Sequence, residues 1–188
     1  MEYLVQNWQD TFDKTFFLFE QIHQSGFIPD IIVGIARGGW VPSRLLADFF
    51  FIKMTANIKI EAYEQIGKMD STVKIIQDIN IDVKAKKVLI VDDIADSGLS
   101  LELAINSLEE KGCNEIKTVT LYYKEQSKII PDYYATKTNA WVIFPWEYFE
   151  SIKELNQLFS QEGLGKEEII MKLKTIGIPS TIVNSYFM

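Results

Sequence analysis

The sequence predicts an α/β fold in which a doubly wound, mainly parallel sheet is flanked by helices. Two unbroken apolar runs, IIVGIA at 31–36 and KVLIV at 87–91, have the length and composition of buried parallel strands. Each run is followed by a glycine-containing loop and a helical pattern, an order that indicates parallel strands with crossover helices. The 188 residues suit one domain, and an apolar fraction of 47% is enough for a full core.

An amphipathic helix is predicted near the N-terminus. Aromatic and apolar residues recur there at steps of four and three, which places them on one face of a helix: Trp8, Phe12, Phe16, Phe19 and Ile22. Such a stripe is more often core than cofactor site, so we expect this face to be buried. Gly26 suits the end of the helix, and His23 within it is given no catalytic role.

The first core strand leads into a loop and then a second helix. Pro42 suits the first turn of this helix, which is expected to reach about Phe50. Apolar residues at 58–62 and 73–79 predict the two strands of a hairpin. The segment between them, 64–72, is polar and without pattern, so we expect a mobile loop.

The remaining sequence continues the alternation. The expected elements are strands at 87–91, 116–122 and 141–144 and a helix at 99–111. Two or three helices are expected from Glu147 onward. We expect a core at 1–150 that includes the N-terminal helix, and a helical extension at 151–188 that packs on the core or on a second subunit.

The composition argues against several classes of function. There are 19 basic and 26 acidic residues, a net charge of −7, so a broad nucleic-acid-binding surface is not expected. The single cysteine, Cys113, excludes an internal disulfide and argues against a cysteine-based zinc site. The apolar runs are shorter than the ~20 residues that cross a bilayer, and the N-terminus lacks the basic region of a signal peptide. We therefore expect a soluble cytoplasmic protein.

The segment VLIVDDIADSGLS, residues 88–100, carries the most chemical information. Its strand runs into two adjacent carboxylates, Asp92 and Asp93, which repel each other and need a partner. Paired carboxylates suit the vicinal hydroxyls of a sugar or a hard divalent cation.

A phosphate site is predicted directly after these acids. In the loop 96–100, backbone amides and the N-terminus of the following helix can converge on one anion. Ser97 and Ser100 add hydroxyl donors, and Gly98 lets the backbone come close. A phosphate site beside a diol site fits a sugar phosphate.

Two other phosphate-related patterns do not fit this segment. The G-x-x-x-x-G-K-[ST] pattern of a P-loop is absent. A two-component receiver domain also carries paired acids after a strand, but it needs them near the start of the domain. Here 91 residues precede Asp92, and the later strands do not end in Asp.

The segment resembles the binding motif for 5-phosphoribosyl 1-pyrophosphate (PRPP) of type I phosphoribosyltransferases. GIARGGWVP at 34–42 resembles the pyrophosphate loop of that family, and WVIFPWE at 141–147 resembles the purine-binding end of the xanthine-guanine enzymes and their archaeal relatives. Lys124, in YYKEQ, stands where 6-oxopurine enzymes carry a lysine. The resemblance covers roughly 28–150 and implies the type I fold with a small hood.

The resemblance implies an enzyme of purine salvage that joins hypoxanthine, guanine or xanthine to PRPP and releases pyrophosphate, with Mg²⁺ on the PRPP. The loop 96–100 would hold the 5′-phosphate, and Ala95 and Leu99 are included among the substrate-binding residues. Asp92 and Asp93 would bind the ribose hydroxyls, with Asp93 in contact with Mg²⁺. A homodimer is expected from the resemblance.

The pyrophosphate loop has its own implied roles. Arg37 and the amides of Gly38 and Gly39 would bind pyrophosphate. Ala36 is included in the same site, because the family often has a non-proline cis peptide here and we expect it at Ala36–Arg37.

The purine would be read by four residues. Asp96 is similar in position to the acid that exchanges a proton with purine N7, and it could cap the following helix at the same time. Trp141 would stack on the purine, and the backbone of Val142 would read its edge. Lys124 would donate to O6, which favours 6-oxopurines over adenine.

Two features depart from the family pattern, and one alternative stays open. Leu99 is bulky for its position, and the loop 64–72 has Lys68 as its one basic residue. The C-terminal sequence has a faint helix-turn-helix look, so a non-catalytic PRPP-binding transcription regulator is the alternative. Because 179–188 contains no Lys or Arg, a packed helical extension is preferred.

Overall fold

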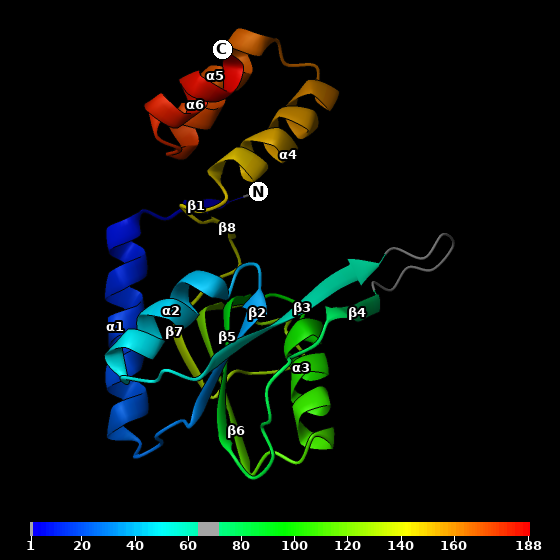
Figure 1. Ribbon diagram of the computed structural model, residues 1–188. Coiled ribbons are helices and arrows are strands. Elements are labelled where there is room, and N and C mark those ends of the chain that lie inside the picture. The colour runs from blue at the N-terminus through cyan, green and yellow to red at the C-terminus, as the bar shows by residue number, and fades with distance from the viewer. Residues whose placement is uncertain (1, 64–71) are drawn as a thin grey trace. The chain divides into compact units, whose positions relative to one another are not determined.

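The computed structural model describes residues 2–63 and 72–188 (Figure 1). These residues cluster into two compact units, and each is described by itself. The larger unit comprises residues 11–138, and the smaller unit joins residues 1–10 to residues 139–188. The loop expected at 64–72 lies outside the described residues, except that Thr72 begins a strand. The division of the chain at residue 150 stays a prediction.

A mainly parallel sheet forms the centre of the larger unit, as the sequence predicts. Its six strands in the described residues are β2 (Ile31–Ala36), β3 (Thr55–Tyr63), β4 (Thr72–Gln77), β5 (Lys87–Ala95), β6 (Glu115–Tyr123) and β7 (Tyr133–Lys137). They lie in the order β4-β3-β2-β5-β6-β7, and every neighbouring pair is parallel except the β3–β4 hairpin. The strand β7 was not expected from the sequence.

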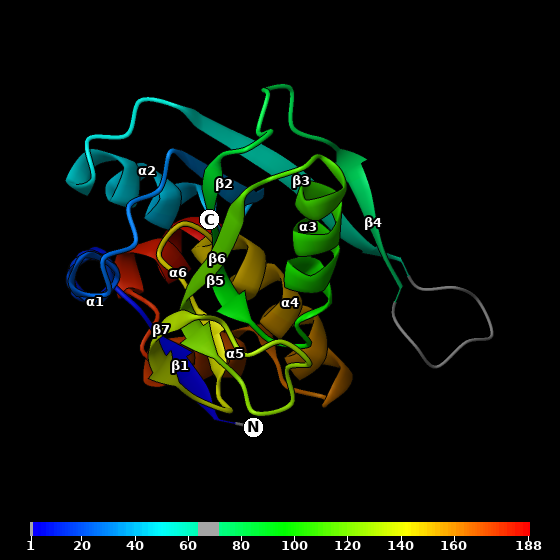
Figure 2. The same cartoon turned by 90° about the horizontal axis from the view of Figure 1, so that it is seen from below.

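Helices cover both faces of this sheet (Figure 2). They are α1 (Trp8–Gln24) and α2 (Trp40–Phe49) on one side and α3 (Leu99–Glu110) on the other. Alternate residues of β2 explain why both faces need cover: Ile31 and Val33 join the cluster packed under α3, whereas Ile32, also fully buried, points to the opposite face.

The prediction that the aromatic stripe of α1 is buried is wrong. Phe12 and Phe16 are 43% and 41% exposed, and of the predicted stripe only Ile22 is fully buried in this unit; the other buried residues of α1 are Thr11, Thr15 and Leu18. The aromatic rings pack sideways on α2, with the Phe12 and Phe16 ring centroids 5.6 and 5.5 Å from that of Phe49. Helical spacing identifies a face, but packing decides which face meets the sheet.

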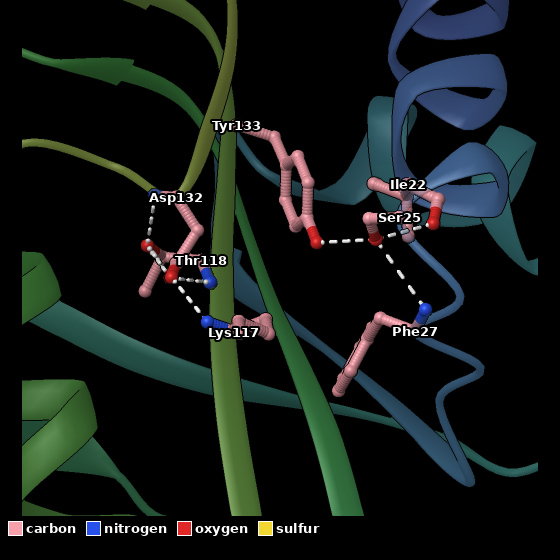
Figure 3. A network of polar contacts seen from close by, with 7 residues as sticks. All are labelled: Ile22, Ser25, Phe27, Lys117, Thr118, Asp132 and Tyr133. Atoms are coloured by element: carbon pink, nitrogen blue, oxygen red, sulfur yellow. Dashed lines mark hydrogen bonds and ion pairs between the residues drawn. The ribbon is translucent and has the colours of Figure 1, made fainter.

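A network of polar contacts connects the amino-terminal half of β6 to the start of β7, and the start of β7 to the end of α1 (Figure 3). Asp132, just before β7, accepts hydrogen bonds from the backbone amide and hydroxyl of Thr118 and from Lys117 Nζ, all at 2.8 Å. Burial raises the pKa of Asp132, but these donors outweigh it and lower the pKa below its usual value. The Tyr133 hydroxyl lies 2.7 Å from Ser25 Oγ, which links β7 to the end of α1.

The smaller unit is built around a parallel pair of short strands, β1 (Tyr3–Val5) and β8 (Trp141–Ile143). The sequence predicted β8 but not β1. Residues 143–188, all described, continue into α4 (Tyr148–Gln161), α5 (Lys166–Ile176) and α6 (Ser180–Phe187). These helices share a core centred on Leu155, Phe159, Leu173 and Val183. In the described part of the chain, every helix is too short or too polar to span a membrane.

Candidate active site

The carboxyl ends of β2, β5 and β6 meet because these strands are parallel neighbours (Figure 1). Gly34 lies opposite Val91, so the loop after β2 is adjacent to the acids that follow Val91. Ala95 lies opposite Tyr123, so Asp96 and Lys124 leave the sheet side by side. Ligands of parallel sheets bind at this edge.

The paired acids are held inside β5. This strand runs to Ala95, beyond its predicted end at Val91, so Asp92 and Asp93 lie within it and are 9% and 8% exposed. Asp92 Oδ1 accepts the Asp93 amide at 3.0 Å. Burial raises the pKa of Asp92 well above its usual value, and the neighbouring charge of Asp93 raises it further. Two buried carboxylates of this kind are poised for a cation or for hydroxyl donors.

The loop after β2 presses its backbone against this pair. A Cβ on Gly38 would overlap the Asp93 carboxyl group, and one on Gly39 would overlap the carbonyl oxygen of Val91. The Ala36–Arg37 peptide is cis, as expected. The Gly39 amide already donates to the Ile35 carbonyl at 2.9 Å. Arg37 and Gly38 are therefore better candidates than Gly39 for binding pyrophosphate.

The predicted phosphate loop packs against the backbone and side chains of residues 127–129. Gly98 has φ +78° and precedes α3, and a Cβ on it would come within 2.5 Å of Ser127 Oγ and 2.7 Å of the Ile129 nitrogen. The Lys128 amide donates to the Ser97 carbonyl at 2.9 Å. The backbone before α3 is thereby fixed, with Ser97, Leu99 and Ser100 at the helix N-terminus, where an anion is favoured.

Asp96 is joined to Lys124 and to a residue that the sequence did not single out, Gln126. Lys124 Nζ lies 2.6 Å from Asp96 Oδ2, and Gln126 Nε2 donates to Asp96 Oδ1 at 2.6 Å. The Lys124 side chain is 13% exposed and that of Asp96 is 52% exposed. The N-cap residue of α3 is Gly98, and the Leu99 amide at the start of this helix donates to Ser97 Oγ at 3.4 Å, so the N-cap position is not held by Asp96.

Trp141 and Val142 belong to the smaller unit. The Trp141 amide donates to the Glu2 carbonyl at 2.9 Å, and its ring centroid lies 6.1 Å from that of Tyr3. Val142 is buried opposite Leu4. Their role as base contacts stays a prediction, whereas the other predicted site residues all lie in the larger unit.

Comparison with known proteins decides the family. The family described as "Phosphoribosyl transferase domain" matches residues 5–150. The chain belongs to the phosphoribosyltransferase family. The match ends within α4, so α5 and α6 of this phosphoribosyltransferase lie beyond it.

Relatives of this phosphoribosyltransferase include enzymes named for purines. A hypoxanthine-guanine phosphoribosyltransferase of Lactococcus lactis is 33% identical over 76% of this chain and 78% of its own. Xanthine phosphoribosyltransferase 1 of Saccharomyces cerevisiae is 29% identical over 72% of this chain and 84% of its own. A purine phosphoribosyltransferase structure from Pyrococcus horikoshii superposes with a TM-score of 0.70 and 33% identity, covering 78% of this chain and 94% of that one. The regulator alternative is not supported.

The acid pair of the phosphoribosyltransferase site also fits the magnesium that the family implies. Residues 2–63 and 72–188 contain no group of three or more acidic, cysteine or histidine side chains that could hold an ion. Mg²⁺ does not require such a cage, because it is commonly bound by one or two carboxylates together with substrate oxygens and water. The buried Asp92 and Asp93 offer such a donor set.

Proposed function

We propose that this phosphoribosyltransferase transfers the 5-phosphoribosyl group of PRPP to hypoxanthine, guanine or xanthine, giving the nucleoside 5′-monophosphate and pyrophosphate in purine salvage. The observation that carries the proposal is the Asp96–Lys124 pair beside the buried acids. A cationic donor next to a carboxylate matches a base with an acceptor oxygen beside a ring N–H. The names of the relatives agree with this class of base.

In the proposed reaction, the larger unit holds the sugar phosphate. Ala95 and the loop at 96–100 bind the 5′-phosphate, and Asp92 and Asp93 bind the ribose hydroxyls. Asp93 is also the residue that would hold Mg²⁺, whose chemistry when bound is to neutralise charge on the leaving pyrophosphate. Arg37 and Gly38 contact that pyrophosphate.

The purine is activated by Lys124 and Asp96. Lys124 donates to the exocyclic oxygen, and Asp96 accepts the ring proton as the nitrogen–C1′ bond forms and the C1′–pyrophosphate bond breaks. Catalysis is then mostly positioning and electrostatic stabilisation of an oxocarbenium-like transition state. In this proposal, Trp141 stacks on the purine and the backbone of Val142 contacts its edge. A homodimer and a cytoplasmic location also belong to this proposal and rest on the resemblance.

The proposal is tested by pyrophosphate release. The purified chain with PRPP and Mg²⁺ is expected to release pyrophosphate when hypoxanthine, guanine or xanthine is added. This release is expected to stop when Mg²⁺ is chelated. Absence of pyrophosphate with all three bases would overturn the proposal.

A further inference from the structure

Gln126 lies on a loop that is fixed to the candidate site at both ends. The Lys124 amide donates to the Ala95 carbonyl at 2.9 Å, and the Lys128 amide donates to the Ser97 carbonyl at 2.9 Å. Gln126 stands between these two hydrogen bonds. Its backbone is therefore anchored to the same segment that carries Asp96.

The side chains divide the Asp96 carboxylate between them. Gln126 Nε2 donates to Oδ1 and Lys124 Nζ contacts Oδ2, each at 2.6 Å. Two donors on two different oxygens fix the plane of a carboxylate, which one donor leaves free to rotate. Lys124 is a partly buried cation and can bind the exocyclic oxygen of a purine in place of Asp96. In this proposal the neutral amide of Gln126 binds only Asp96.

We propose that Gln126 is a positioning residue for the proton transfer at Asp96. This inference rests on the proposed function. When the base binds, Lys124 passes from Oδ2 to the exocyclic oxygen, and the released Oδ2 accepts the proton from the ring nitrogen. Gln126 keeps its hydrogen bond to Oδ1 throughout, and the ring N–H of the base replaces Lys124 as the donor to Oδ2. The carboxylate therefore keeps a donor on each oxygen, and Oδ2 stays directed at the base. The donor of Gln126 thus acts through Asp96 and not on the substrate.

The first test compares Gln126→Leu with Glu125→Gln, a change of an exposed neighbour that forms an ion pair with Lys137. Gln126→Leu is expected to lower kcat about 10-fold, the effect of losing one hydrogen bond to a charged group, with the KM for PRPP unchanged. Gln126→Glu replaces the donor with an acceptor and is expected to lose at least as much. Unchanged kcat in either Gln126 variant, at an unchanged melting temperature, would overturn the inference.

A double-mutant cycle with Asp96→Asn separates positioning from direct contact. If Gln126 acts through the Asp96 carboxylate, adding Gln126→Leu to Asp96→Asn is expected to lower kcat by less than about 2-fold. A further 10-fold loss would show that Gln126 acts independently of Asp96 and would contradict the proposal.

The outcomes also separate this inference from the proposed function. A wild-type chain that releases no pyrophosphate refutes the proposed function, and this inference with it. An active wild-type chain whose Gln126→Leu variant behaves like Glu125→Gln refutes the inference alone.

Discussion

Asp92 occupies a position that favours its ligand over the stability of the fold. The pKa of its carboxyl is raised by burial and by Asp93. Because the pKa of this carboxyl is raised in the folded state, the group favours folding most at low pH. Once the pH exceeds the pKa that the carboxyl has in the unfolded chain, its ionisation opposes folding. Binding of the proposed Mg²⁺ or of the ribose hydroxyls at Asp92 would remove that penalty.

Among the single residues of the site, Gly38 gives the sharpest steric prediction. Gly38→Ala places a methyl group against the Asp93 carboxyl group, so we expect turnover to fall by about 100-fold or more because the acid must move. Gly165→Ala is the matched control, since its Cβ would lie 3.6 Å from Glu168, an ordinary contact. Steady-state kinetics of the two variants checks the prediction, and equal activity would contradict the close approach.

The residues of the site differ in how far they could be predicted. Asp92, Asp93 and the loop at 96–100 follow from local patterns, because strand, paired acids and glycine are contiguous. Gln126 gives no such signal, since a polar residue in a polar loop is ordinary. Its contact with Asp96 depends on the β5–β6 register, which brings together positions 30 residues apart.

At the scale of elements, Asp132 fastens the connection between β6 and β7. Its pKa is lowered on folding, so its contribution to stability is present above the unfolded pKa and is lost as the pH falls through the lower, folded value. The same carboxylate is held by Lys117, whose pKa is raised, first by the hydrogen bond to Asp132. This network therefore favours folding at neutral pH.

Asp132→Asn is expected to lower the melting temperature at pH 7, by roughly 2–4 °C for each kcal/mol lost. The difference from wild type is expected to shrink as the pH falls below the ordinary pKa of an aspartate and through the lower, folded pKa of Asp132, where the carboxylate becomes protonated. Asp48→Asn is the control, because its 3.4 Å pair with Arg44 is exposed and such pairs contribute little. Thermal melts across this pH range would contradict the account if Asp132→Asn lost the same stability at both ends.

The elements themselves show where sequence patterns stop being informative. The core strands β2 and β5 were predictable because buried parallel strands are continuously apolar. The three residues of β1 were not, since they acquire a partner only at Trp141–Ile143, far along the chain. The aromatic face of α1 was misassigned because α2, and not the sheet, packs against Phe12 and Phe16.

At the scale of the whole molecule, the family match and the two compact units divide the chain differently. The family match spans residues 5–150, whereas the smaller unit joins residues 1–10 to residues 139–188. The predicted base contacts Trp141 and Val142 fall inside the family match and inside the smaller unit.

In the proposed function, the molecule selects a purine by its oxygen at position 6. The most direct measurement is the ratio of kcat/KM for hypoxanthine to that for adenine, in the wild-type chain and in Lys124→Ala. A site built to donate to O6 is expected to favour hypoxanthine by on the order of 100-fold or more, and removal of the Lys124 donor is expected to reduce that ratio at least 10-fold. Comparable use of adenine by the wild type, or equal losses with both bases in Lys124→Ala, would contradict the claim.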